Sequence, residues 1–389
     1  MCESVNTQQQ IPVLYVRGTN YEIGHAIGKT FCNLISNFFE LNEDFKNSVL
    51  SFYGTPVGKN IYDESLKVAN QRFPHYVQEI QGMADGSGIP FHHLYLLHIE
   101  NLVPASDSEP ENPNKGDQGC TSLITNTREA LLLGHTEDAS VAMSNNFYIV
   151  SAEVLAEDGV TVIENFATLT YPGYLPGGTM GYNEHGIVHS VNSIYPKKRF
   201  PTRTSYLFLL RAILGAKNLR EVEDILRDEG SGTHDGFSVN VISTKDSSTP
   251  GDVITACNIE VSASQNGSPH SDLYIEYVQM GNSYAHCNKY LRCPVEEESW
   301  PGASSVERHE TLRNFTKPYN LPTVQKILSV ELPNDGKCSK YSIFKRSFGP
   351  DDPYETIAVG IFDVFAKRWY LYRNPPDKSG PVAVLPMDF

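Results

Sequence analysis

The sequence lacks an excess of positive charge. It has 31 Lys and Arg residues against 46 Asp and Glu residues, which gives a formal net charge of −15. Binding to nucleic acid and binding to anionic lipid both need clustered positive charge. We therefore expect neither nucleic acid nor a membrane among the partners. The acidic balance favours cationic small molecules mildly and solubility mainly.

Long hydrophobic runs and paired cysteines are also missing. The first ten residues, MCESVNTQQQ, have no basic segment followed by an apolar one, as a secretory signal would. The seven cysteines are scattered without C-x-x-C spacing, which favours neither a disulfide framework nor a zinc ribbon. His286, Cys287 and Cys293 lie near one another in the sequence but fit no zinc-site spacing. We expect a cytoplasmic protein with no metal and no other cofactor.

The order of apolar residues divides the chain into a helical part and a β-rich part. Helical spacing predicts helices over 18–52, 62–83, with an interruption near Pro74, and 92–103. A stretch rich in Pro, Gly and charge, 104–119, predicts an exposed loop. Strand pairs are then predicted over 120–138, 147–166, 179–195, 237–261, 271–288 and 356–373, with helices over 204–230 and about 304–314. Helices set apart from antiparallel strands indicate an α+β fold.

The junction Asp117-Gln118-Gly119-Cys120-Thr121 carries the chemical signal. A cysteine that opens a strand is usually a small buried hydrophobe. The alternative is self-cleavage, in which the thiol attacks the preceding carbonyl carbon and forms a thioester. A preceding glycine leaves the thiol room to approach. Hydrolysis then frees the α-amine of the cysteine, whose pKa near 8 suits a general base for its own thiol.

The segment GCTSLI followed by GHTED resembles the N-terminal-nucleophile hydrolases of the isopenicillin N acyltransferase type, which are relatives of the choloylglycine hydrolases. The resemblance extends from YVRGTNYEIGHAIG through EIQGMADGSGIP to the last strands. The length and the string PNKGDQGC are most similar to family members that hydrolyse β-alanyl amines. The resemblance implies an αββα four-layer sandwich in one structural domain. It also implies cleavage between Gly119 and Cys120 into an α subunit, 1–119, and a β subunit, 120–389.

The resemblance also implies a set of site residues. Cys120 matches the N-terminal nucleophile, and Asp138 in GHTEDAS matches an Asp that orients the α-amine of that nucleophile. Asn192 in NEHGIVHSVNSIY and Asn240 in HDGFSVNVIS match amide donors to an oxyanion, each worth on the order of 3 kcal/mol. Arg308 in SSVERHETLR matches an Arg near the nucleophile. Without the resemblance, these residues would be read as ordinary turn, backbone-bonding and surface residues.

Three further features near the matched residues have weaker support as parts of the site. His135 and His309 stand beside matched residues and are secondary candidates. The stretch Ala285-His286-Cys287-Asn288-Lys289 departs from the His-Thr-Asn-His that the family often has, so no site residue is assigned there.

The predicted function is a self-processing cysteine amidohydrolase acting on small-molecule amine amides. Its products would be dopamine and β-alanine from N-β-alanyldopamine, and histamine and β-alanine from carcinine. The active form would be an αβ heterodimer, and a dimer of heterodimers stays open. An acyltransferase that uses acyl-CoA or a similar donor through the same thioester is one alternative, and a catalytically silent binding module is another. The substrate ammonium needs a carboxylate or carbonyl cluster that the sequence does not single out.

Overall fold

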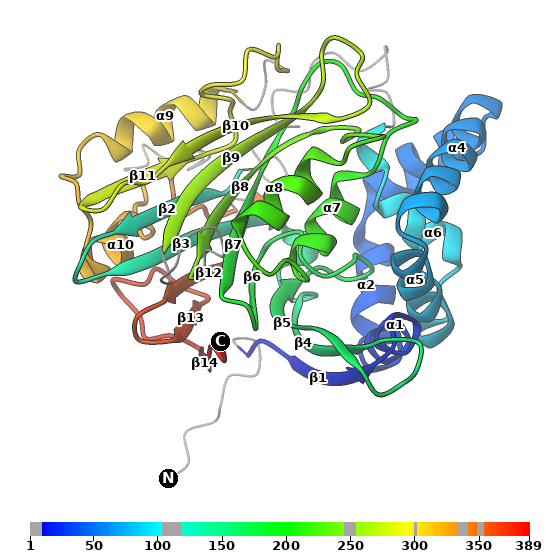
Figure 1. The fold of residues 1–389 in the computed structure, drawn as a ribbon, viewed down its shortest axis with the longest axis horizontal. Coiled ribbons are helices and arrows are strands. Elements are labelled where there is room, and N and C mark those ends of the chain that lie inside the picture. The colour runs from blue at the N-terminus through cyan, green and yellow to red at the C-terminus, as the bar shows by residue number, and fades with distance from the viewer. Residues whose placement is uncertain (1–9, 103–118, 245–253, 299–301, 333–340, 348–353) are drawn as a thin grey trace.

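Two β-sheets lie face to face in the computed structural model of the protein, with helices over their outer faces (Figure 1). The structure describes residues 10–102, 119–244, 254–298, 302–332, 341–347 and 354–389. The larger sheet runs, in spatial order, β1 (Val13–Gly18), β4 (Tyr148–Leu155), β5 (Val162–Thr170), β6 (Met180–Asn183), β7 (Ile187–Ile194), β8 (Gly236–Ser243), β9 (Thr255–Ala263) and β10 (Ser271–Tyr277). The smaller sheet runs β11 (Asn282–His286), β2 (Thr121–Asn126), β3 (Leu131–Ser140), β12 (Tyr354–Asp363), β13 (Arg368–Tyr372) and β14 (Ala383–Pro386).

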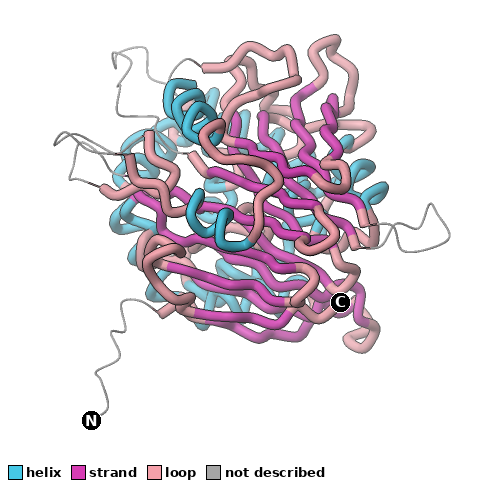
Figure 2. Tube along the Cα trace, turned by 90° about the vertical axis from the view of Figure 1, so that its left-hand side faces the viewer, coloured by secondary structure: helices cyan, strands magenta, loops and turns pink. Residues whose placement is uncertain are grey.

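The helices form two groups, one on each side of the paired sheets. On the side of the larger sheet are α1 (Asn20–Thr30), α2 (Cys32–Leu41), α3 (Leu50–Tyr53), α4 (Pro56–Arg72), α5 (Pro74–Ser87), α6 (Phe91–Leu97), α7 (Tyr206–Ile213) and α8 (Leu219–Arg227). On the side of the smaller sheet are α9 (Gly302–Leu312) and α10 (Leu321–Ile327). Figure 2 shows helices both in front of and behind the strands. Short π or 3-10 turns occupy Phe45–Val49, Glu100–Leu102 and Val141–Met143.

The burial pattern shows why the sheets stack between helices. Strands β2 and β8 are buried along their whole length, because each has one face against the other sheet and one against helices. Leu210 of α7 packs in one apolar cluster with Val239 of the larger sheet. Val324 of α10 packs in another cluster with Leu123 of the smaller sheet. The predicted α+β class and αββα layering are confirmed.

The N-terminal segment differs from its prediction in two ways. It begins with β1, which pairs in parallel with β4, so this segment adds a strand to the larger sheet. The helix predicted over 18–52 is divided into α1, α2, the π turn and α3. Helix α1 starts with the side chain of Thr19 accepting a hydrogen bond from the backbone N–H of Glu22.

Glycines allow helices α1 and α5 to touch along their backbones. A Cβ atom at Gly24 would lie 1.8 Å from the carbonyl oxygen of Glu79. One at Gly82 would lie 2.0 Å from the carbonyl oxygen of Tyr21. Any side chain at either position would push the two helices apart.

The strand pair predicted over 271–288 is wrong. Strand β10 pairs with β9 in the larger sheet, and β11 pairs with β2 in the smaller one. The chain therefore crosses between the sheets after Tyr277. This crossing brings Asn288, which follows β11, close to Gly119.

Candidate active site

Cys120 lies immediately before β2, at the open end of a hairpin that β2 forms with β3. The register pairs Thr121 with Thr136 and Ser122 with His135, as the polar turn between the two apolar runs predicts. Cys120 is 7% exposed. A strand alternates its side chains between two faces, so Cys120 and Ser122 share the face that looks toward the larger sheet. The hydroxyl of Ser122 lies 3.0 Å from that of Ser190 on β7, which places the site between the two sheets.

Gly119 occupies a position with little room for a side chain. A Cβ atom there would lie 2.4 Å from Nη2 of Arg308 and 2.4 Å from Oδ1 of Asn288. Both of those side chains are buried. The glycine that the self-cleavage chemistry favours is therefore also favoured by the packing of Arg308 and Asn288 around it.

The carbonyl oxygen of Cys120 is held by two donors from different layers. Nη1 of Arg308 donates to it at 2.7 Å, and Nδ2 of Asn192 donates to it at 3.0 Å. Arg308 comes from α9 and is fully buried, and it also donates to Oγ1 of Thr121 at 3.0 Å and to Oδ1 of Asn288 at 3.0 Å. These bonds fix the backbone of the residue that bears the thiol.

Asn240 lies beside Asn192, on the neighbouring strand β8 of the same sheet. Its Nδ2 donates to Oδ1 of Asn192 at 2.8 Å and to the hydroxyl of Ser190 at 3.3 Å. Its Oδ1 accepts a hydrogen bond from Nδ2 of Asn258 at 3.0 Å. The contacts of Asn240 therefore orient the Asn192 amide, and its predicted role toward an oxyanion stays a prediction.

The Asp138 side chain is buried and lies on the face of β3 that points away from the larger sheet. Its Oδ1 accepts a hydrogen bond from Oγ1 of Thr356 at 2.6 Å, and its Oδ2 lies 3.7 Å from Nζ of Lys345. Burial raises the pKa of the Asp138 carboxyl, whereas the nearby Lys345 and Arg308 work to lower that pKa. The backbone of Asp138 is hydrogen-bonded to the thiol of Cys120. The predicted bond to the α-amine stays a prediction.

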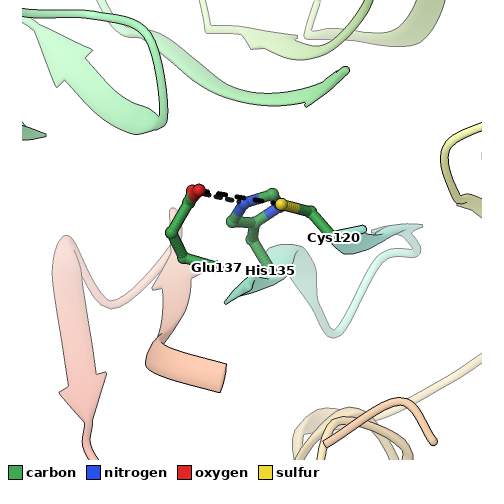
Figure 3. Close-up of side chains that lie close together, drawn as sticks. All are labelled: Cys120, His135 and Glu137. Atoms are coloured by element: carbon green, nitrogen blue, oxygen red, sulfur yellow. Dashed lines mark hydrogen bonds and ion pairs between the residues drawn. The ribbon is translucent and has the colours of Figure 1, made fainter. Parts of the chain in front are cut away.

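A row of polar side chains continues from Cys120 along the inner face of the hairpin (Figure 3). The thiol of Cys120 lies 3.7 Å from Oε1 of Glu137, and Oε2 of Glu137 lies 3.0 Å from Nε2 of His135. The hydroxyl of Tyr171 donates to Oε1 of Glu137. Burial raises the pKa of the Cys120 thiol well above its usual value, and the carboxylates of Glu137 and Asp138 raise it further. The uncut chain therefore holds Cys120 as a thiol.

Among the described residues, one group of possible metal ligands lies close together: Cys120, His135 and Glu137. One ligand atom from each lies within 4.8 Å of the others. Donor atoms around a tetrahedral zinc are roughly 3.3–3.8 Å apart, given bonds of about 2.0–2.3 Å. Glu137 already bonds to both Cys120 and His135, so the arrangement is accounted for as a hydrogen-bonded chain.

Asn288 is a site residue that the sequence reasoning passed over. Its Oδ1 accepts from Arg308, and its Nδ2 donates to the carbonyl oxygen of Ser193 at 2.9 Å. Its amide thus lies against Gly119, beside the bond predicted to break. The signal was its place directly after β11, in the stretch set aside because it departs from the family pattern.

His309, a secondary candidate, is hydrogen-bonded to the thiol of Cys287 and not to that of Cys120. Burial opposes ionisation of the Cys287 thiol, but Arg308 and His309 together lower its pKa to about 7. Cys287 lies behind β2, with its sulfur 3.9 Å from Oγ1 of Thr121. An acidic thiol therefore lies next to the arginine that holds the Cys120 carbonyl.

Residues 125–378 match the sequence profile of the family described as acyl-coenzyme A:6-aminopenicillanic acid acyl-transferase. The match spans well over half of the chain and begins just after Cys120. The chain belongs to this acyltransferase family. The resemblance to the isopenicillin N acyltransferase type is thereby confirmed.

This member of the acyltransferase family has a curated relative of nearly equal length. It is 33% identical over 386 residues to the β-alanyl-dopamine/carcinine hydrolase of Drosophila melanogaster, covering 98% of this chain and 97% of the relative. A solved structure, penicillin V acylase from Agrobacterium tumefaciens, matches with a TM-score of 0.34 and 11% identity, over 65% of this chain and 82% of the acylase. Within the described ranges, no helix is long and apolar enough to cross a membrane.

Proposed function

We propose that the protein cleaves itself between Gly119 and Cys120 and then hydrolyses β-alanyl amides of small amines, N-β-alanyldopamine and carcinine among them. The observation that carries the proposal is the fixed position of Cys120. Arg308 and Asn192 donate hydrogen bonds to its carbonyl oxygen, while its thiol faces the space between the sheets. The choice of substrate is supported by the activity for which the Drosophila relative is named.

Self-cleavage would begin with attack of the Cys120 sulfur on the carbonyl carbon of Gly119. The C–N bond between the two residues breaks, and the Cys120 nitrogen takes up the thiol proton. This leaves a thioester between Gly119 and the sulfur. Water then hydrolyses the thioester and releases the carboxylate of Gly119, the thiol and a free α-amine. The subunits would be 1–119 and 120–389, associated as an αβ heterodimer.

Turnover would use the same sulfur. The α-amine of Cys120 takes the thiol proton, and the thiolate attacks the β-alanyl carbonyl carbon. The tetrahedral oxyanion would accept hydrogen bonds from side-chain amides, for which Asn192, whose Nδ2 donates to the Cys120 carbonyl, is the candidate and Asn240 supports Asn192. Collapse expels the amine, which takes the proton from the α-ammonium, and water hydrolyses the β-alanyl thioester. Asp138 would orient the α-amine.

Mass spectrometry tests the self-cleavage directly. Dividing 43.3 kDa in proportion to 119 and 270 of 389 residues gives fragments of about 13 and 30 kDa. Cys120→Ala should remain one chain and release no β-alanine from either amide. Active wild-type protein that runs only at 43.3 kDa would end the N-terminal-nucleophile proposal, and substantial turnover by Cys120→Ala would remove Cys120 from it.

Acyl transfer is the second candidate, because the matched family is described by an acyltransferase activity. The same Cys120 thioester would then pass its acyl group to an amine instead of water. Product that forms only when acyl-CoA is added would favour this candidate. Release of free β-alanine without any added acyl donor would favour hydrolysis.

The cytoplasmic location stays a prediction.

A further inference from the structure

A buried carboxylate faces the Cys120 thiol, and the mechanism above gives it no task. Glu137 is 5% exposed and comes from β3, with Oε1 3.7 Å from the Cys120 sulfur (Figure 3). Its neighbour Asp138 points to the other face of the strand, where Thr356 bonds it. The two adjacent acids therefore flank Cys120 from different sides and need separate explanations.

The surroundings of Glu137 hold its carboxylate in one place. His135 bonds Oε2 at 3.0 Å, and Tyr171 donates to Oε1. His135 is itself fixed by a bond of 2.8 Å between its Nδ1 and the hydroxyl of Ser122. Each carboxylate oxygen has two acceptor positions. Oε2 therefore keeps one open position, and Oε1, which also accepts from the Cys120 thiol, gains one when that thiol loses its proton.

No lysine or arginine among the described residues forms an ion pair with Glu137, whose one salt-bridge partner there is His135. A buried carboxylate normally has a cationic partner, because taking a charge out of water is costly. Glu137 also raises the pKa of the Cys120 thiol, which opposes formation of the nucleophile. Both costs fall when a cation binds beside the carboxylate.

We infer that Glu137 binds the ammonium group of the substrate's acyl part, and so selects short aminoacyl amides over neutral acyl amides. The inference rests on the proposed amide hydrolysis at Cys120. In a β-alanyl thioester four bonds separate the sulfur from the ammonium nitrogen, which gives a span of about 3–5 Å with staggered torsions. An ammonium at about 2.8 Å from Oε1 lies within that span, because Oε1 is 3.7 Å from the sulfur.

The test compares two amides of the same amine. N-β-alanyldopamine and N-butanoyldopamine have acyl chains of equal length and differ in the terminal ammonium or methyl group. Wild-type protein should have a higher kcat/KM for the β-alanyl amide. Glu137→Gln should lower kcat/KM for that amide about 100-fold, as expected when one partner of a buried charge pair is removed, and change that for the butanoyl amide less than about threefold.

A matched control is available on the other sheet. Glu260 of β9 is also a buried carboxylate, and its Oε1 lies 3.0 Å from Nε2 of His286. Glu260→Gln should leave the ratio of the two kcat/KM values unchanged. Formation of the two fragments by each variant reports whether its site has folded.

The outcomes separate this inference from the proposed function. If wild-type protein hydrolyses neither amide, the proposed function fails and the inference fails with it. If wild-type protein hydrolyses both amides but prefers the butanoyl amide, the inference alone fails. If wild-type protein prefers the β-alanyl amide but Glu137→Gln keeps that preference, or loses both activities equally, Glu137 acts on the thiol or the fold and the inference alone fails.

A second variant covers the case in which Glu137→Gln does not accumulate. Glu137→Asp withdraws the carboxylate by one carbon–carbon bond, about 1.5 Å. The preference should then shift from β-alanyl toward γ-aminobutanoyl amides, whose ammonium reaches one bond further. An unchanged ratio between these two amides in Glu137→Asp would overturn the inference.

Discussion

Replacing Gly119 with alanine tests whether the packing before Cys120 sets the rate of self-cleavage. The new Cβ would lie 2.4 Å from two atoms, Nη2 of Arg308 and Oδ1 of Asn288. Neither atom can withdraw easily, since both side chains are buried and hydrogen-bonded to each other and to their surroundings.

The size of the effect follows from the distances. Ordinary contacts of a Cβ atom begin at 3.4 Å, so one group must move by about 1 Å. A displacement of about 1 Å in a reacting geometry can cost on the order of 100-fold in rate. Overpacking a closed site costs about 1–3 kcal/mol of stability. We expect Gly119→Ala to slow self-cleavage about 100-fold while the chain still folds.

The assay follows newly synthesised protein through time on a denaturing gel, as the uncut chain gives way to the two fragments. Gly380→Ala is the control, because a Cβ at Gly380 would meet no atom within 4 Å, and it should cleave at the wild-type rate. Urea unfolding compares the double variant Gly119→Ala/Cys120→Ala with the single variant Cys120→Ala. Because neither protein can cleave itself, the difference in their free energies of unfolding measures the packing cost. Cleavage of Gly119→Ala within threefold of the wild-type rate would refute the reasoning.

Three further perturbations follow from the contacts around the site and nearby. Asn192→Ala should lower kcat about 100-fold and Asn240→Ala about tenfold, because Asn240 acts through Asn192; steady-state kinetics showing equal losses would contradict this order. Thr356→Val removes the donor to Asp138 and should cost about 1–2 kcal/mol in urea unfolding, with a lower kcat of the cleaved enzyme; an unchanged kcat would count against the proposed role of Asp138. Burial raises the pKa of Glu100 to about 7 from 4.5, so the stability linked to its protonated form is complete below pH 4.5 and is lost as the pH rises through 7. Glu100→Gln should therefore be more stable than wild type by about 1–3 kcal/mol at pH 8 and nearly equal at pH 4; thermal unfolding showing the same difference at both pH values would rule this out.

Local patterns were sufficient to predict the elements that support the nucleophile. The turn after Asn126 separates two apolar runs, and these became β2 and β3. Arg308 was matched on a predicted helix and lies on α9, with its guanidinium on the Cys120 carbonyl. A hairpin and a helix depend on neighbours within a few residues, so their signals are present in the sequence itself.

The features that were missed depend on register and on crossings between layers. Glu137 joins Cys120 on one face only once Thr121 is known to pair with Thr136. Asn288 reaches Gly119 because the chain leaves the larger sheet after β10 and β11 joins the smaller sheet. In sequence, two apolar runs around a turn look the same whether they pair together or separate. Asn192 and Asn240 are alike in sequence, and only the pairing of β7 with β8 shows that Asn192 contacts Cys120 while Asn240 contacts Asn192.

The parallel pairing of β1 with β4 has a consequence for the lifetime of the enzyme. If the chain is cut as proposed, β1 remains hydrogen-bonded into a sheet whose other strands belong to the second fragment. The two pieces would stay together while folded, but no covalent tether would bring them together again after unfolding. Folding would be first order in the precursor, and recovery of the cut protein would be second order and would fall on dilution. Unfolding after the cut would then be irreversible in practice, and the working life of the enzyme would be set by its unfolding rate.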